Sequence, residues 1–153
     1  VIDAMDRRVD VQRVRDMIKA ARAAGIGTGT FIMLGYPGER EEDILRTVEH
    51  LKESSPDVFT ITVAYPITGT ELHAQVEADL EHPLPWELGS DRELDFPRAY
   101  RKPYYGHAVR YVVNEVEWHK AREGGRRTSP RALRHKLRAW SGRAGMLLWR
   151  SLS

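Results

Sequence analysis

Two short segments of this 153-residue chain combine residue types and spacing that could bind a ligand. Gly35-Tyr-Pro-Gly-Glu39 follows one apolar run, and Ala64-Tyr-Pro66 follows another. In α/β proteins, ligands bind where parallel strands end and the chain turns into a helix. Glycine in such a turn lets the backbone approach a ligand closely. A plain strand-to-helix connection is an equally good interpretation of the first segment alone, because every parallel α/β fold needs several of them.

Glu115 and His119 form the other pair with possible chemistry, because residues four apart on a helix lie on the same side. A metalloenzyme helix of the His-Glu-x-x-His type supplies two ligands and a base, and a third ligand comes from elsewhere. This pair has no partner motif, so we interpret it as a solvated surface pair and expect no metal site. No acid, base or nucleophile stands in a motif that assigns it a catalytic role.

A βαβ unit is predicted to position the two segments. Phe31 to Leu34 is a short apolar run, which suits a strand covered on both faces. The next helix begins among acidic residues and ends at Ser54-Ser55-Pro56. In the second strand, Val58 to Tyr65, large apolar residues alternate with small or hydroxyl-bearing ones. This alternation is typical of a barrel strand with helices outside and a ligand cavity inside.

Helices are expected on both sides of this unit. The first covers Val11 to Ala24, with Asp10 as its cap, and is expected to bury one apolar stripe: Val11, Val14, Ile18 and Ala21. Thr70 is a predicted cap for a helix over Glu71 to Leu80, and a longer helix is predicted from Tyr104 to about Arg122.

Between these last two helices, helical and strand periodicity disappears over 81–103. An irregular connection of this length is either a functional lid or a poorly ordered loop. Its aromatic residues Trp86, Phe96 and Tyr100 either cover a substrate cavity or pin the loop to the core.

Charge is distributed unevenly along the chain, although the net value is only +2. Residues 120–153 hold ten Lys or Arg residues and one acidic residue, Glu123. We expect a linker over 124–130 and then a basic helix from Arg131 to about Leu152, with Ser129 as cap and Pro130 in its first turn. One face of this helix carries apolar residues, namely Leu133, Leu137, Trp140, Ala144 and Leu147 or Leu148.

Three interpretations of this basic helix compete. It packs on its own domain, or it lies on an anionic membrane surface through its apolar face, with Trp140 and Trp149 at the interface. Nucleic-acid binding is the weakest, because no known reader motif is present and the acidic remainder would repel a duplex.

A resemblance to a known family rests on a series of segments within residues 1–75. The series consists of Asp3-Ala-Met-Asp-Arg-Arg8, a helix ending Ala23-Ala-Gly-Ile26, Gly27 to Glu39, a helix with Thr47 and His50, Pro56-Asp57, and Ala64-Tyr-Pro-Ile-Thr-Gly-Thr70. It resembles the C-terminal half of a radical S-adenosylmethionine core domain. The subgroup it is most similar to is cobalamin-dependent and includes the anaerobic magnesium-protoporphyrin monomethyl ester cyclase.

The resemblance implies a partial (β/α) barrel that holds a [4Fe-4S] cluster and S-adenosylmethionine. Reductive cleavage of this cofactor gives a deoxyadenosyl radical that abstracts hydrogen from a small-molecule or lipid-like substrate. The resemblance implies two groups of cofactor-binding residues. The backbone of the first group would lie along the adenosine part of the cofactor, and the second group would close over the adenine. The first group is Met33, Leu34, Gly35 and Tyr36, and the second is Ala64, Tyr65 and Pro66.

One departure from the family is absolute, because its cluster is bound by a Cys-x3-Cys-x2-Cys run and this chain has no cysteine. The chain also starts at Val1 without an initiator methionine. We therefore expect a piece of a longer enzyme whose missing N-terminal part binds the cluster and holds any cobalamin domain.

The expected α/β organisation is the C-terminal part of a TIM-like barrel over 1–80, the irregular connection over 81–103, a helix packing on the core over 104–123, and the linker and basic helix over 124–153. A non-catalytic α/β module that docks on a membrane or a partner protein is the main alternative. A piece of an ordinary (β/α)8 enzyme is a third.

No apolar run is long enough to span a membrane. We expect a cytoplasmic location, because the implied chemistry is oxygen-sensitive, with peripheral membrane association as the alternative.

Overall fold

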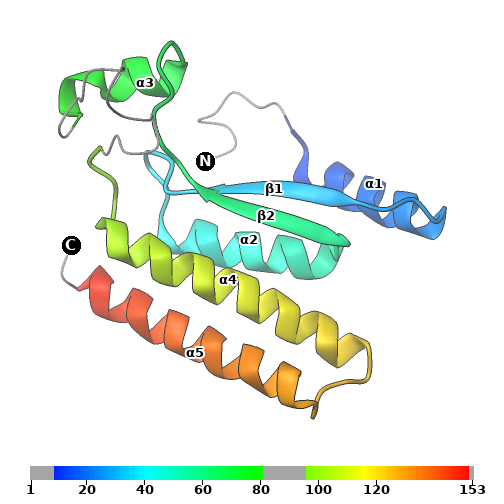
Figure 1. The fold of residues 1–153 in the computed structure, drawn as a ribbon. Coiled ribbons are helices and arrows are strands. Elements are labelled where there is room, and N and C mark those ends of the chain that lie inside the picture. Colours follow the sequence, from blue (N-terminus) through cyan, green and yellow to red (C-terminus); the bar gives the residue numbers. More distant parts are fainter. Residues whose placement is uncertain (1–8, 81–95, 152–153) are drawn as a thin grey trace.

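The computed structural model describes residues 9–80 and 96–151 of the chain. Figure 1 shows its elements, which in chain order are α1 (Val11–Ala23), β1 (Gly29–Leu34), α2 (Glu41–Ser54), β2 (Val58–Val63), α3 (Glu71–Val76), the 3-10 turn η2 (Glu77–Asp79), α4 (Lys102–Glu123) and α5 (Pro130–Arg150). The Asp3 to Arg8 segment, Trp86 and most of the expected irregular connection over 81–103 lie outside the described residues.

The strands β1 and β2 pair in parallel, and their register runs from Gly29 opposite Val58 to Leu34 opposite Val63. Helix α2 connects them, so the expected βαβ unit is confirmed. The α/β class is confirmed with it. The described residues form an open two-stranded sheet, and no barrel is seen in them.

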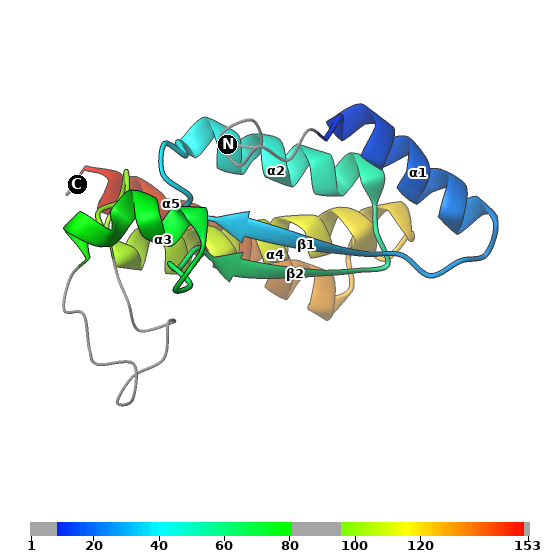
Figure 2. The same ribbon diagram turned by 90° about the horizontal axis from the view of Figure 1, so that it is seen from above.

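Only one face of the sheet is covered, so the expectation of a strand buried on both faces was wrong for β1. Helices α2 and α4 share a hydrophobic core with Leu34 and the inward-facing residues of both strands. Figure 1 shows α2 and α4 on the same side of the two strands, and in Figure 2, which looks down on the strands, α4 lies behind them. On the opposite face, the side chain of Phe31 is 87% exposed and that of Met33 is 38% exposed. An apolar run without polar alternation does not reveal whether its second face has a covering layer.

The core is centred on α4, which contributes many of its fully buried side chains. Its members are Leu34, Ile44, Val48, Leu51, Tyr104, Tyr105, Ala108, Val112, Val116 and Met146. Tyr100 stacks on Tyr104 with ring centroids 4.0 Å apart. Aromatic pairs of this kind contribute about 0.5–1.5 kcal/mol beyond their buried area.

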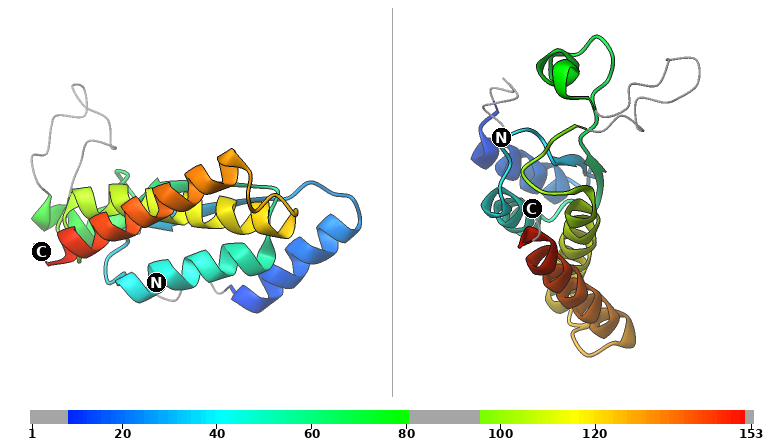
Figure 3. Two further views of the ribbon diagram at one scale, coloured as in Figure 1. Left: turned by 90° about the horizontal axis from the view of Figure 1, so that it is seen from below. Right: turned by 90° about the vertical axis from the view of Figure 1, so that its left-hand side faces the viewer.

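Helix α5 packs along α4 through small side chains. Its buried residues are Ala132, Ala139, Gly142 and Met146. A Cβ on Gly142 would lie only 2.7 Å from the backbone nitrogen of Tyr111, which shows how closely the two helices approach. Figure 3 shows α5 as the outermost layer beside α4.

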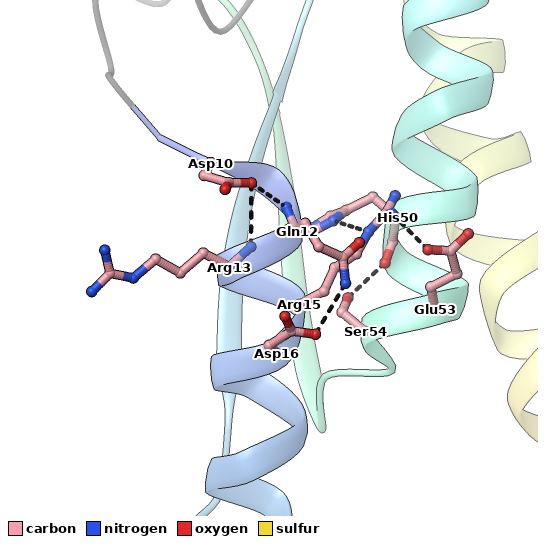
Figure 4. A network of polar contacts seen from close by, with 8 residues as sticks. All are labelled: Asp10, Gln12, Arg13, Arg15, Asp16, His50, Glu53 and Ser54. Carbon is pink, nitrogen blue, oxygen red and sulfur yellow. Dashed lines mark hydrogen bonds and ion pairs between the residues drawn. The ribbon is translucent and has the colours of Figure 1, made fainter.

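Helix α1 packs loosely on α2 through polar contacts, which Figure 4 shows. Arg15 donates to Nδ1 of His50 at 3.2 Å and forms an ion pair with Glu53 at 2.6 Å. Burial, and then the Arg15 charge, lower the pKa of His50, which keeps its imidazole neutral and able to accept. The apolar stripe that we expected α1 to bury is only half-buried, and no residue of this helix is fully buried in the structure.

The three expected helix caps are confirmed. Asp10 accepts hydrogen bonds from the first turn of α1, Thr70 from His73 of α3, and Ser129 from Ala132 of α5. The helix expected over residues 71–80 is shorter, because α3 ends at Val76 and tightens into η2.

Candidate functional site

The structure brings the two candidate segments together at the carboxyl edge of the sheet. The backbone N–H of Ala64 donates to the carbonyl oxygen of Leu34 at 2.7 Å, which joins the ends of β1 and β2. Most of the seven candidate residues are covered: Leu34, Gly35, Tyr36, Ala64 and Pro66 are buried and Tyr65 is half-buried. Met33 alone among them is exposed, on the open face of the sheet.

Glu39 fixes the turn that follows β1. Its carboxylate accepts a hydrogen bond from the backbone N–H of Gly35 at 2.6 Å, and its own N–H donates to the carbonyl of Tyr36 at 3.0 Å. Gly35 and Gly38 adopt φ of +78° and +81°, which glycine tolerates without strain. The sequence marked Glu39 only as one of several acidic residues at a helix start, and its role in the turn was missed.

Burial changes the acidity of this carboxyl group. Glu39 is 2% exposed, and the loss of water around it raises its pKa to about 7. The hydrogen bond from Gly35 opposes this shift, and the nearby Asp43 adds to it. Glu39 therefore titrates near neutral pH at the turn between β1 and α2, where the sequence places a candidate ligand site.

Arg98 connects the ends of both strands and was also missed from the sequence, because it lies in a segment without periodicity. Its guanidinium donates from Nη2 to the carbonyl of Ala64 at 2.6 Å and lies over the ring of Phe96, 4.0 Å from its centroid. A Cβ on Gly35 would lie 3.3 Å from Cδ of Arg98 and equally close to Tyr105. The side chains of Arg98 and Tyr105 therefore fill the space beside Gly35.

The described end of the irregular connection is pinned to the core. Phe96 is 3% exposed and belongs to a small cluster with Tyr36, Ala64, Leu72 and Val76. The hydroxyl oxygen of Tyr100 accepts a hydrogen bond from the backbone of Glu41 at 3.2 Å. Of the two roles considered for these aromatics, anchoring is confirmed for Phe96 and Tyr100.

The site fits the implied cofactors only in part. Without cysteine, the chain offers no thiolate for an iron–sulfur cluster. The side chains of Arg98 and Tyr105 occupy the space next to the Gly35 backbone, so a ligand has no access to that backbone in this structure. The accessible surface next to the candidate residues is the open sheet face, where Met33 lies opposite Thr62. Binding of S-adenosylmethionine by Met33 to Tyr36 and by Ala64 to Pro66 stays a prediction.

Glu115 and His119 have separate partners. Glu115 forms ion pairs with Lys52 at 3.2 Å and Lys136 at 3.8 Å, whereas Nε2 of His119 lies 3.4 Å from Glu123. Among the described residues, no group of three or more His, Asp or Glu side chains is arranged to hold a metal ion.

No protein-family model matches this chain, and no curated protein matches it. Within the part of the chain that the structure describes, none of the helices has the length and apolar character needed to cross a bilayer.

Proposed function

We propose that this chain is the C-terminal part of a radical S-adenosylmethionine enzyme, and that it shapes the cofactor and substrate side of the pocket. One observation carries the proposal: the two segments that resemble the family end adjacent parallel strands and meet at the same carboxyl edge. Ligands of open α/β sheets bind at this edge. The exposed sheet face beside it supplies the surface on which a ligand would lie.

In this proposal the chain contributes position and shape and no catalytic acid, base or nucleophile. Glu39 and Arg98 hold the two strand ends in place, and Met33 and Thr62 form the accessible sheet surface beside them. A [4Fe-4S] cluster, and cobalamin where it is used, would be held by another part of the enzyme. When bound there, the cluster and S-adenosylmethionine would supply a deoxyadenosyl radical. The substrate class we propose is a small or lipid-like organic molecule modified in the cytoplasm.

The coding DNA upstream of Val1 tests the proposal directly. We expect a continuous reading frame that encodes a Cys-x3-Cys-x2-Cys run within several hundred bases. A start codon next to Val1 and no such run would exclude the enzyme.

The full-length protein then tests the role of the open face. After anaerobic reconstitution, we expect Met33→Glu to weaken S-adenosylmethionine binding by about tenfold, because binding would remove water from a carboxylate on this sheet surface. Met17→Glu is the matched control, since Met17 is exposed on α1. Equal affinities for the two variants, measured by equilibrium dialysis, would remove Met33 from the cofactor site.

A further inference from the structure

Helix α5 has two apolar faces, and the larger side chains are on the outer one. Small residues and Met146 pack it against α4. The outer face is a stripe of residues at helical spacing, all exposed or half-exposed: Leu133, Leu137, Trp140, Ala144, Leu147 and Leu148. The five large members of this stripe are each between 46% and 62% exposed. A helix that only packed on its own domain would bury its large side chains and expose polar ones.

The cations of α5 divide into paired and unpaired ones. Three of them are neutralised by acidic residues of α2 and α4: Lys136 pairs with Glu115, and Arg143 and Arg150 pair with Glu41 at 2.5 and 3.0 Å. Arg131, Arg134 and Arg138 are exposed, and none of them forms an ion pair with a described residue. At 3.6 residues per turn, Arg134 borders the outer stripe next to Leu148, and Arg138 and Arg131 lie further round the helix. Helix α5 itself contains no acidic residue. The exposed surface of α5 therefore combines an apolar stripe with positive charge that no acidic residue of the helix offsets.

We propose that the outer face of α5 docks on a membrane surface that carries anionic lipid headgroups, with the helix lying parallel to that surface. The apolar stripe would enter the boundary between headgroups and acyl chains, and Trp140 would sit at the level of the headgroups. Arg134, at the edge of the stripe, would contact lipid phosphates, and the other unpaired arginines would add to the attraction.

The charges argue against a second copy of this chain as the occupant. A symmetric dimer through this face would bring the unpaired cations of two α5 helices near each other, and the helix has no carboxylate to offset them. Helix α4 lies between α5 and the sheet, as Figure 3 shows, so docking would leave the candidate site at the strand ends uncovered. The inference is thus independent of the proposed enzyme function.

Vesicle co-sedimentation of the full 153-residue chain tests the proposal. We expect binding to vesicles of phosphatidylcholine with phosphatidylglycerol, little binding to phosphatidylcholine alone, and a loss of binding as salt is raised. The double variant Leu137→Gln/Leu148→Gln should weaken binding at least about tenfold. The matched control is Met17→Gln/Ile26→Gln, which changes two exposed apolar residues away from α5 and should bind as the original chain does.

A second pair of double variants tests the electrostatic contribution to vesicle binding. Arg134→Gln/Arg138→Gln should lose binding by about tenfold or more, whereas Arg13→Gln/Arg46→Gln, on the exposed surfaces of α1 and α2, removes the same charge and should lose little. All the substituted side chains are exposed, and circular dichroism would verify that each variant is folded.

Three results would overturn the proposal. The first is no sedimentation with anionic vesicles at low salt. The second is equal loss for the α5 variants and their controls, which would show nonspecific attraction by the basic chain. The third is a dimer in analytical ultracentrifugation that the Leu137→Gln/Leu148→Gln variant dissociates while lipid binding stays unchanged, which would assign the face to a second copy.

Discussion

At the scale of single residues, Glu39 links the local turn to the candidate site. Its carboxylate lies at the point where β1 ends and is held by the N–H of Gly35. Burial favours the protonated form of this group, because a charged carboxylate loses its hydration there. The turn therefore includes a group that changes charge near neutral pH.

Glu39 should make folding stability depend on pH. Its pKa is about 7 in the folded chain, against an ordinary value of 4.5 for a glutamate side chain in water, so the folded state binds more protons than the unfolded state between these values. Stability from this group is thus fully present below pH 4.5 and is lost as pH rises through 7, by on the order of 3 kcal/mol. We expect Glu39→Gln to remove this decline.

Denaturant unfolding of both proteins between about pH 5 and 8 measures the effect. Glu42→Gln is the control, because Glu42 is exposed on α2 and should leave the pH profile unchanged. Parallel profiles for Glu39→Gln and the original chain would show that Glu39 is not the titrating group.

At the scale of elements, close packing of α4 and α5 depends on glycine. The atoms nearest to a Cβ on Gly142 belong to the backbone of α4, which cannot rotate away as a side chain would. Gly106 is the opposite case, because a Cβ there meets no atom within 4 Å. The same substitution should therefore have opposite signs at these two helical positions.

Gly142→Ala should lower the free energy of unfolding by about 1–3 kcal/mol, since overpacking forces the helices apart. Gly106→Ala should raise it by about 0.5–1 kcal/mol, because alanine favours the helix over glycine. Thermal and urea unfolding of the two variants measure this difference. Stabilisation by Gly142→Ala would contradict the close helix approach.

At the scale of the whole molecule, Glu41 joins the first turn of α2 to the far end of the chain. It is 9% exposed and pairs with both Arg143 and Arg150 of α5. The sequence separation of its partners means that this contact forms only when the whole core is assembled. The Glu41 side chain is mostly buried, whereas those of Arg143 and Arg150 are 31% and 52% exposed, so loss of the carboxylate leaves two partly solvated cations without compensation.

We expect Glu41→Gln to destabilise the fold by about 1–3 kcal/mol, and Glu42→Gln, which changes its exposed neighbour, by less than about 0.5 kcal/mol. Urea unfolding followed by circular dichroism compares the two. The difference should shrink as salt is added, because part of it is electrostatic. Equal destabilisation of the two variants would indicate that Glu41 stabilises the N-terminus of α2 and not the contact with α5.

Much of the local structure could be predicted from the sequence. The strand-turn-helix order, the caps Asp10, Thr70 and Ser129, and the alternation in β2 depend on neighbouring residues, and the structure confirms them. The meeting of the two candidate segments at one sheet edge also followed, since parallel strands joined by one helix end on the same side. Their ligand stays a prediction.

Other features were decided only by tertiary structure. An apolar strand has the same sequence whether one or both of its faces are covered, so the exposure of Phe31 was not predictable. Arg98 reaches Ala64 from 34 residues away, and α5 packs through small residues while its leucines face outward. These outcomes depend on contacts between segments distant in the chain, and local propensity and periodicity contain no information about which segments will meet.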